Sequence, residues 1–236
     1  MPLIMEKTVT QPSILRFYRS PIGKKLVTGM TGLGLVTFVS IHLTGNLLLF
    51  AGHDAYNAFA HFLESLGPLF WLTESMLLAV FALHIAAGLQ LFVHNRRSRP
   101  DRYARYASRG KPSLQSLSSR TMPFTGMIIG AFLVIHLLNF KFGTYYLTQL
   151  DGQTVRDLSR LVIEKFQTPW YTFGYTGVMV LLGVHLRHGF WSALQSLGLM
   201  SKGLRFSIYG LSLVLAIAIS AGFIGLPLAI YAGLLH

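Results

Sequence analysis

The feature that most constrains this chain is a set of histidines placed deep inside long apolar segments. Crossing a bilayer takes about 20 apolar residues, and runs of that length cover residues 25–50, 70–94, 122–146, 170–196 and 206–235. The first four runs contain, in order, His42, His84, His136 and His185. An ionisable group inside a bilayer is costly and usually marks a functional site. The sequence therefore predicts an all-α integral membrane protein, a five-transmembrane-helix bundle formed by residues 1–236 as a single domain.

Composition is consistent with a membrane location. Of the 236 residues, 12% are charged and 52% are hydrophobic, and the mean hydropathy is +0.51, whereas soluble domains carry about 25% charged residues. The chain contains no cysteine, which excludes disulfides and thiolate-ligated zinc or iron–sulfur sites within it. The first 24 residues contain no continuous apolar core, so we expect no cleaved signal peptide.

The positive charge of the chain, +12 in total, alternates between the segments that connect the apolar runs. The connection between the first and second runs has no Lys or Arg. Basic residues gather instead before the first run, between the second and third, and between the fourth and fifth: Lys7, Arg16, Arg19, Lys24, Lys25; Arg96, Arg97, Arg99, Arg102, Arg105, Arg109, Lys111, Arg120; Lys202, Arg205. Under the positive-inside rule this alternation predicts a cytoplasmic N-terminus and an outside C-terminus. It also argues against nucleic-acid binding as the reason for the charge.

Helical rise places two of the histidines toward the outer side of the membrane. His42 lies 17 residues beyond Lys25, which is about 25 Å from the inner face at 1.5 Å per residue. His136 lies 16 residues beyond Arg120, or about 24 Å. The matching depths predict that His42 and His136 form an outer pair.

The other two histidines match at a shallower depth, nearer the cytoplasm. His84 lies 10 residues before His94, at the inner end of its run, about 15 Å from the inner face. His185 lies 11 residues before Ser196, or about 16 Å. We therefore expect His84 and His185 to form an inner pair.

Paired neutral imidazoles are what a haem iron requires when both of its axial positions are filled. A single buried histidine is more often a hydrogen-bonded packing residue, but four at two matched depths favour ligands. We expect two haem b groups, one per leaflet, that transfer electrons and do not bind oxygen. His188 lies three residues beyond His185 on the same helix face and stays open as an alternative ligand. Arg187 and His188 are candidate contacts for a haem propionate.

The segments between the apolar runs also contain structural signals. Residues 51–69 predict a short interfacial helix that ends near Gly67 and Pro68, and the pattern VRDLSRLVIEKF within 147–168 predicts a helix along the outer surface. Pro123 is expected in the first turn of the third transmembrane helix. A small-residue stripe in the first run allows close approach of a neighbouring helix or a flat cofactor; it comprises Gly29, Gly32 and Gly34.

Four sequence segments resemble a known family: SIHLTGN around His42, LHIAAGL around His84, LVIHLLNFKFG around His136, and HLRHGFWSALQSLG from His185 onward. In this order and spacing they are similar to the dihaem cytochrome b membrane anchor of succinate dehydrogenases and fumarate reductases, the succinate:quinone oxidoreductases. In that family the fourth-helix ligand is followed four residues later by Gly, and after that by an apolar residue and an aromatic one. His185, followed by Gly189 and Phe190, fits that frame better than His188.

The resemblance implies a multi-pass protein of the bacterial inner (cytoplasmic) membrane with two partner subunits on its cytoplasmic face. One is a flavoprotein that carries FAD, and the other is an iron–sulfur subunit that would meet the basic N-terminus and the Arg-rich loop. Electrons would pass from succinate through flavin and clusters to the inner haem, then to the outer haem and a membrane quinone. The resemblance favours menaquinone, and places no dicarboxylate active site in this chain.

A quinone site needs a proton donor or acceptor in an apolar crevice. Glu64 and Glu74 are the carboxylates near the outer ends of the first two runs, which makes them the quinone-site candidates. Two other functions remain open on the residues alone. One is the dihaem anchor of another membrane oxidoreductase, of the hydrogenase or formate dehydrogenase type. The other is a haem-free transporter or anchor that uses the histidines to relay protons.

Overall fold

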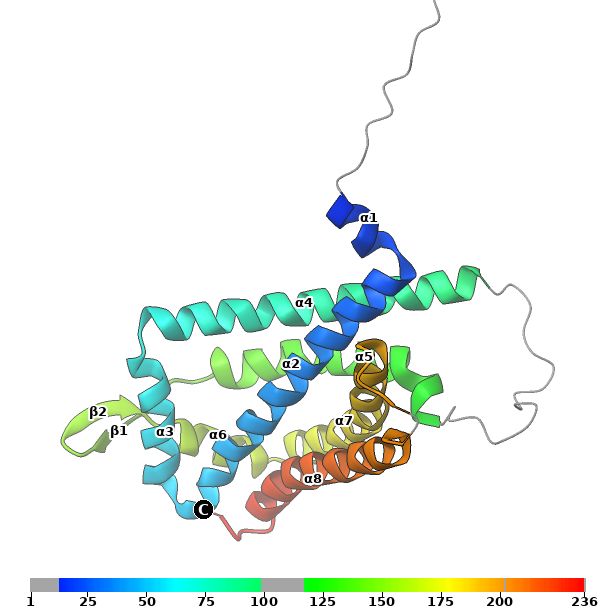
Figure 1. Ribbon diagram of the computed structural model, residues 1–236. Helices are drawn as coiled ribbons and strands as arrows, with labels where there is room; N and C mark the ends of the chain where they lie inside the picture. Colours follow the sequence, from blue (N-terminus) through cyan, green and yellow to red (C-terminus); the bar gives the residue numbers. More distant parts are fainter. Residues whose placement is uncertain (1–12, 99–116, 202, 236) are drawn as a thin grey trace, which may run out of the picture.

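The computed structural model describes residues 13–98, 117–201 and 203–235, and this part of the chain is mostly helical (Figure 1). The elements in chain order are α1 (Ser13–Arg19), α2 (Pro21–Leu47), the 3₁₀ turn η1 (Leu48–Ala51), α3 (His53–Ser65), α4 (Pro68–Arg97), α5 (Leu117–His136), the π-helical turn η2 (Leu137–Lys141), β1 (Leu147–Leu150), β2 (Gln153–Arg156), α6 (Leu158–Phe166), α7 (Pro169–Ser196) and α8 (Arg205–Tyr231).

Within the described residues, four helical segments are long and apolar enough to cross a membrane. They are Pro21–Ala51, Pro68–Arg97, Leu117–Lys141 and Arg205–Tyr231, and they coincide with four of the five apolar runs. Large apolar side chains along them are exposed, as for Leu72, Met76 and Leu83 on α4, which suits contact with lipid. The multi-pass membrane character expected from the sequence is therefore supported.

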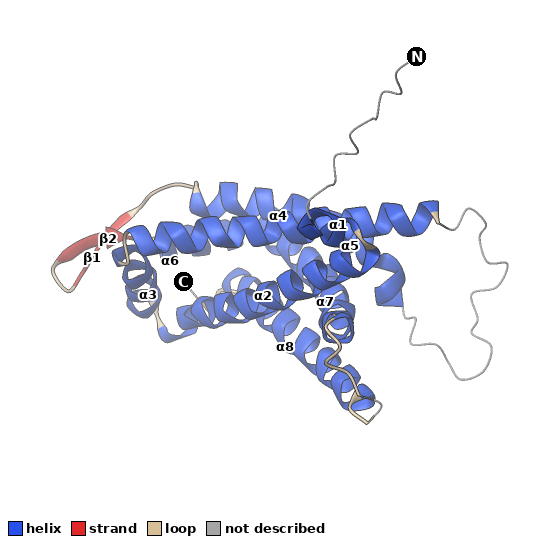
Figure 2. Cartoon of the chain, turned by 45° about the horizontal axis from the view of Figure 1, so that its top comes forward, coloured by secondary structure: helices blue, strands red, loops and turns tan. Residues whose placement is uncertain are grey.

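The fourth predicted run forms α7, one continuous helix of 28 residues, but it is not among those four segments. α7 packs against α2, α5 and α8, while α4 packs on α2 (Figures 1 and 2). Three of the long helices begin at a proline, namely Pro21, Pro68 and Pro169. Proline at the first helical position costs no hydrogen bond, since an N–H there would have no intrahelical acceptor.

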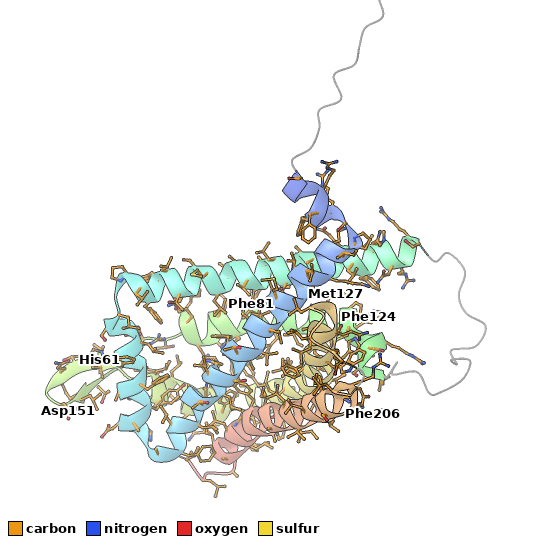
Figure 3. All side chains as sticks on the ribbon, viewed as in Figure 1. His61, Phe81, Phe124, Met127, Asp151 and Phe206 are labelled. Atoms are coloured by element: carbon orange, nitrogen blue, oxygen red, sulfur yellow. The ribbon has the colours of Figure 1, made fainter. Side chains whose placement is uncertain are left out.

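Short elements cover one end of the bundle. α3, α6 and the β1–β2 hairpin gather there, whereas α1 and the last turns of α4 lie toward the other end (Figure 1). Figure 3 places His61 on α3 and Asp151 at the hairpin tip, at that same covered end. A buried cluster fills the space beneath it, made of Leu49, Tyr56, Val162, Ile163, Phe166, Tyr175, Leu226 and Ile230.

The predicted interfacial helix in 51–69 is present as α3, and Gly67, with a φ of +55°, provides the turn into α4. The prediction for 147–168 was only partly right, because its helix α6 begins at Leu158 and a hairpin precedes it. Asp151 and Gly152, with φ of +49° and +78°, form the two-residue turn between paired Leu150 and Gln153. Asp-Gly is a favoured pair in such turns.

The prediction for Pro123 was wrong. α5 begins at Leu117, so Pro123 lies inside the helix, in its second turn. Ser118 is buried and Arg120 belongs to the same helix, so the helix extends beyond the apolar run that was used to locate its start. Hydropathy marks the apolar part of a helix and not its polar first turn.

The α7–α8 contact gives the first prediction. A Cβ added at Gly183 would collide with Oγ of Ser220 on α8 and lie 3.2 Å from its Cβ, whereas one added at Gly177 would meet nothing within 4 Å. Gly183→Val should therefore lower the free energy of unfolding by about 1–3 kcal/mol through overpacking. Gly177→Val is the matched control, and both can be compared by thermal unfolding of the purified protein in detergent. Equal loss in the two variants would contradict this packing.

Candidate functional site

The structure brings His42 of α2 and His136 of α5 together. Their ring centres lie 5.8 Å apart with an angle of 88° between the ring planes. Aromatic side chains enclose the two rings: Phe38 stacks on His42 at 5.5 Å, and Phe140 lies 5.3 Å from His136. His136 is the last residue of α5, where the helix passes into the π-helical turn η2. Such turns occur frequently at functional sites.

His84 of α4 and His185 of α7 face each other in the same way, with ring centres 6.5 Å apart and 71° between the planes. The two pairs are those predicted from depth. Each pair joins two helices that are far apart in the sequence, so the four histidines connect α2, α4, α5 and α7.

The Nδ1 atoms of the inner pair are hydrogen-bonded by threonines. Thr31 Oγ1 lies 3.1 Å from His84 Nδ1, and Thr125 Oγ1 lies 3.0 Å from His185 Nδ1. These contacts leave the Nε2 atom of each inner ring available to a ligand.

The outer pair is held differently. Nδ1 of His136 is buried and has no hydrogen-bond partner, while Asn46 Nδ2 lies 3.4 Å from His42 Nε2. Most buried polar atoms in proteins are hydrogen-bonded, so an orphaned ring nitrogen calls for an explanation. Nδ1 of His136 is therefore open to a ligand atom or a buried water.

The spacing of both pairs suits a metal bound between the rings. A metal ion lies about 2.0–2.1 Å from each ligating imidazole nitrogen, which puts the two ring centres about 6 Å apart. The observed distances are 5.8 and 6.5 Å. Among the described residues, no three histidine or carboxylate side chains are grouped to hold a bare metal ion. Each pair therefore offers two protein ligands, and a macrocycle that supplies the remaining ligands fits this donor set.

His185 and His188 have separate surroundings, although they lie one turn apart on α7. His185 faces His84, whereas His188 lies beside Trp191 with ring centres 5.9 Å apart. Arg187, the candidate propionate contact, donates a hydrogen bond of 2.8 Å to the Tyr209 hydroxyl on α8. Its Nε is buried without a partner. This geometry favours His185 as the ring that opposes His84.

Of the two predicted quinone-site carboxylates, Glu74 forms an ion pair with Lys141 of η2. The Lys141 ammonium lies 4.9 Å from the ring centres of both Phe70 and Trp71. Glu64 is exposed on α3. Glu74 is thus a half-buried carboxylate with a cationic partner and aromatic neighbours.

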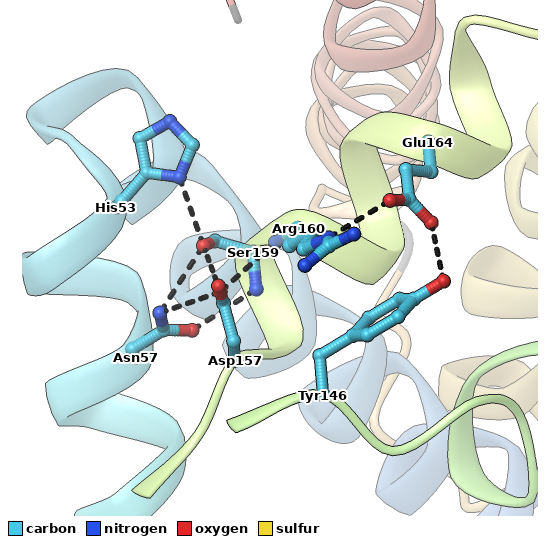
Figure 4. A network of polar contacts seen from close by, with 7 residues as sticks. All are labelled: His53, Asn57, Tyr146, Asp157, Ser159, Arg160 and Glu164. Atoms are coloured by element: carbon cyan, nitrogen blue, oxygen red, sulfur yellow. Dashed lines mark hydrogen bonds and ion pairs between the residues drawn. The ribbon is translucent and has the colours of Figure 1, made fainter. Parts of the chain in front are cut away.

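The remaining histidines do not join the pairs. His94 lies in the last turn of α4, and His61 is on α3, while His236 lies outside the described residues. His53, at the start of α3, instead contacts α6. Its Nδ1 lies 2.9 Å from Ser159 Oγ (Figure 4).

Figure 4 shows that contact within a polar network joining α3 to the start of α6. Asp157 caps α6 by accepting a hydrogen bond from the Arg160 N–H. Its carboxylate also accepts from Ser159 Oγ at 2.7 Å and Asn57 Nδ2 at 2.9 Å. Asn57 is 1% exposed and Ser159 is fully buried. The network therefore joins two of the covering elements, α3 and α6, to each other.

No protein-family model, curated protein or solved structure matches this chain. The geometry of the site is therefore the basis for its interpretation.

The network predicts a pH dependence of stability. Burial raises the pKa of Asp157, but hydrogen bonds from Ser159, Asn57 and the Arg160 backbone outweigh it, so the pKa lies below the ordinary value of 3.8. A lowered folded-state pKa means that the stabilisation is complete above about pH 4 and is lost as the pH falls through the folded-state value.

Asp157→Asn should therefore weaken the dependence of the melting temperature on pH below about 4. Asp151→Asn at the hairpin tip is the matched control and should retain the wild-type slope. Thermal unfolding in detergent between pH 3 and 6 measures both. A parallel loss of stability in the wild type and Asp157→Asn as the pH falls would contradict the role assigned to the Asp157 carboxylate.

Proposed function

We propose that this chain is a dihaem cytochrome b that anchors a succinate:quinone oxidoreductase in the bacterial inner membrane and carries electrons through it. The observation that carries the proposal is the arrangement of four histidines as two facing pairs within an apolar helical bundle. His84 and His185 would hold the inner haem b, and His42 and His136 would hold the outer one. A haem b with two imidazole ligands supplies one-electron transfer and has no open position for oxygen.

The chain's own residues have three tasks in this function. The histidines hold each cofactor from both sides and keep it between two helices. The aromatic side chains around the outer pair, including Phe38 and Phe140, exclude water from the rings. The inner threonines orient the inner imidazoles. Together these contacts fix the two sites at different depths along the bundle.

We propose further that α7 is the fifth membrane-spanning helix. Its 28 residues extend about 42 Å, more than the roughly 30 Å hydrocarbon core. Its packing against α2, α5 and α8 gives its polar side chains protein neighbours in place of lipid, which makes its lower apolarity tolerable. Five spans with basic residues at the α1 end put the N-terminus in the cytoplasm and the C-terminus outside.

The cytoplasmic end would dock the iron–sulfur subunit and, beside it, the flavoprotein with FAD. Arg16 and Arg19 of α1 and Arg96 and Arg97 of α4 lie toward this end and form its basic surface. The Arg-rich segment 99–116, to which a partner role was also assigned, lies outside the described residues. Electrons from succinate would enter at the inner pair, because it is nearer this face.

A membrane quinone, with menaquinone favoured, would accept electrons near the outer pair. Glu74 suits a proton-handling role better than Glu64, because it is half-buried among Phe70 and Trp71 and paired with Lys141. Glu64, exposed on α3, has no such apolar surroundings.

Haem content and ligand variants test this function. The purified chain should contain two low-spin b-type haems, counted by pyridine haemochrome and seen in a reduced-minus-oxidised spectrum. His84→Ala and His185→Ala should each remove one haem, and the double variant should remove no more than either single variant, because both residues hold the same group. His188→Ala is the control and should keep both haems.

A chain without visible absorption would refute the haem function and favour the proton-relay alternative. Loss of haem in His188→Ala with retention in His185→Ala would overturn the ligand assignment. Reduction of the haems by succinate, together with co-purified flavin, would distinguish this complex from the anchors of hydrogenases or formate dehydrogenases.

A further inference from the structure

Both inner histidines are contacted by a Thr-Gly dipeptide from a neighbouring helix. Thr31 and Gly32 of α2 lie against His84, and Thr125 and Gly126 of α5 lie against His185. The two dipeptides belong to helices that carry the outer histidines and are about 94 residues apart in the sequence, yet they make the same contacts. In each, the threonine meets Nδ1 and the glycine faces Cε1 of the ring.

The hydroxyl protons identify which nitrogen of each ring carries hydrogen. A threonine hydroxyl has one proton to donate, and Thr31 donates it to the Val27 carbonyl at 2.6 Å. Oγ1 of Thr31 must therefore accept the hydrogen bond from His84. The proton of the neutral His84 ring is then on Nδ1.

The same reasoning applies on the other side of the site. Thr125 donates to the backbone carbonyl of Thr121 or Met122, each at 3.1 Å, so its oxygen accepts from His185 Nδ1. In a neutral imidazole one nitrogen is a donor and the other an acceptor. Both inner rings therefore present the Nε2 lone pair, which is the form that a metal ligand needs.

The glycines make this approach possible. A Cβ at Gly32 would lie 3.2 Å from His84 Cε1, and one at Gly126 would lie 3.3 Å from His185 Cε1. Both distances are shorter than an ordinary van der Waals contact. A larger residue at either position would push the ring away from the threonine beside it.

We propose that Thr31-Gly32 and Thr125-Gly126 are paired positioning elements that fix the tautomer and the orientation of the inner haem ligands. This inference rests on the proposed haem function. It goes beyond that function because it assigns a role to residues that contact the histidine ligands and would not themselves bind the iron. An acceptor at Nδ1–H strengthens electron donation from the opposite nitrogen, which favours the ferric state. The outer pair has no such arrangement, since Nδ1 of His136 has no partner.

The test replaces each hydroxyl with a methyl group of the same shape. Thr31→Val, Thr125→Val and the double variant are compared with Thr31→Ser and Thr125→Ser, which keep the hydroxyl. Thr37→Val is the matched control, because Thr37 is an exposed threonine of α2 whose hydroxyl bonds only its own helix. The readouts are haem content per chain, the electron paramagnetic resonance spectrum of the ferric haems, and the midpoint potential of each haem.

We expect the valine variants to raise the midpoint potential of one haem, change its ferric spectrum and weaken its retention by roughly 10-fold or more. The other haem should be unaffected, and the serine variants and Thr37→Val should resemble wild type. Valine variants that hold both haems with wild-type spectra and potentials would overturn the positioning role and leave the haem function standing. A wild-type chain without haem would refute both proposals at once.

Discussion

The arrangement of this protein depends on one constraint: an imidazole inside an apolar bundle needs a partner for each ring nitrogen. An unsatisfied polar group in such surroundings costs several kcal/mol. The inner rings meet this need at Nδ1 through Thr31 and Thr125, and in the proposed function their Nε2 atoms would bind the haem iron. The outer rings meet it only in part, since Nδ1 of His136 has no partner. The two sites therefore share a pair of facing imidazole rings but differ in the hydrogen bonding around them.

That constraint accounts for several features of the helices. α7 carries His185, Arg187 and His188, which make it less apolar than the helices it packs against. His185 contacts α4 and α5, and Arg187 contacts α8. Glycines occur where a ring or helix comes close: Gly32 faces His84, and Gly29 faces the backbone of Ala193 on α7. The small-residue stripe of the first run thus serves both helix packing and the approach of a histidine, while Gly34 meets nothing within 4 Å.

The pairing of the histidines could be predicted from the sequence because helical rise is nearly constant, so sequence distance from a charged boundary translates into depth. The β1–β2 hairpin was missed, since its strands are only four residues long and the following helix dominated the pattern; the Asp151-Gly152 pair was the available signal. The contact of His53 with Ser159 joins residues 106 positions apart, which no local pattern reveals. The direction of Arg187 toward Tyr209 likewise depends on how α7 and α8 are rotated against each other.

The central claim is that the facing histidines of each pair bind one group between them. An experimental density map of the purified chain in detergent or lipid tests it most directly. The account predicts a planar macrocycle between His84 and His185 and a second between His42 and His136, with the inner iron bonded to the Nε2 atoms. Histidine rings in direct contact with one another, or density for lipid in place of a macrocycle, would contradict it.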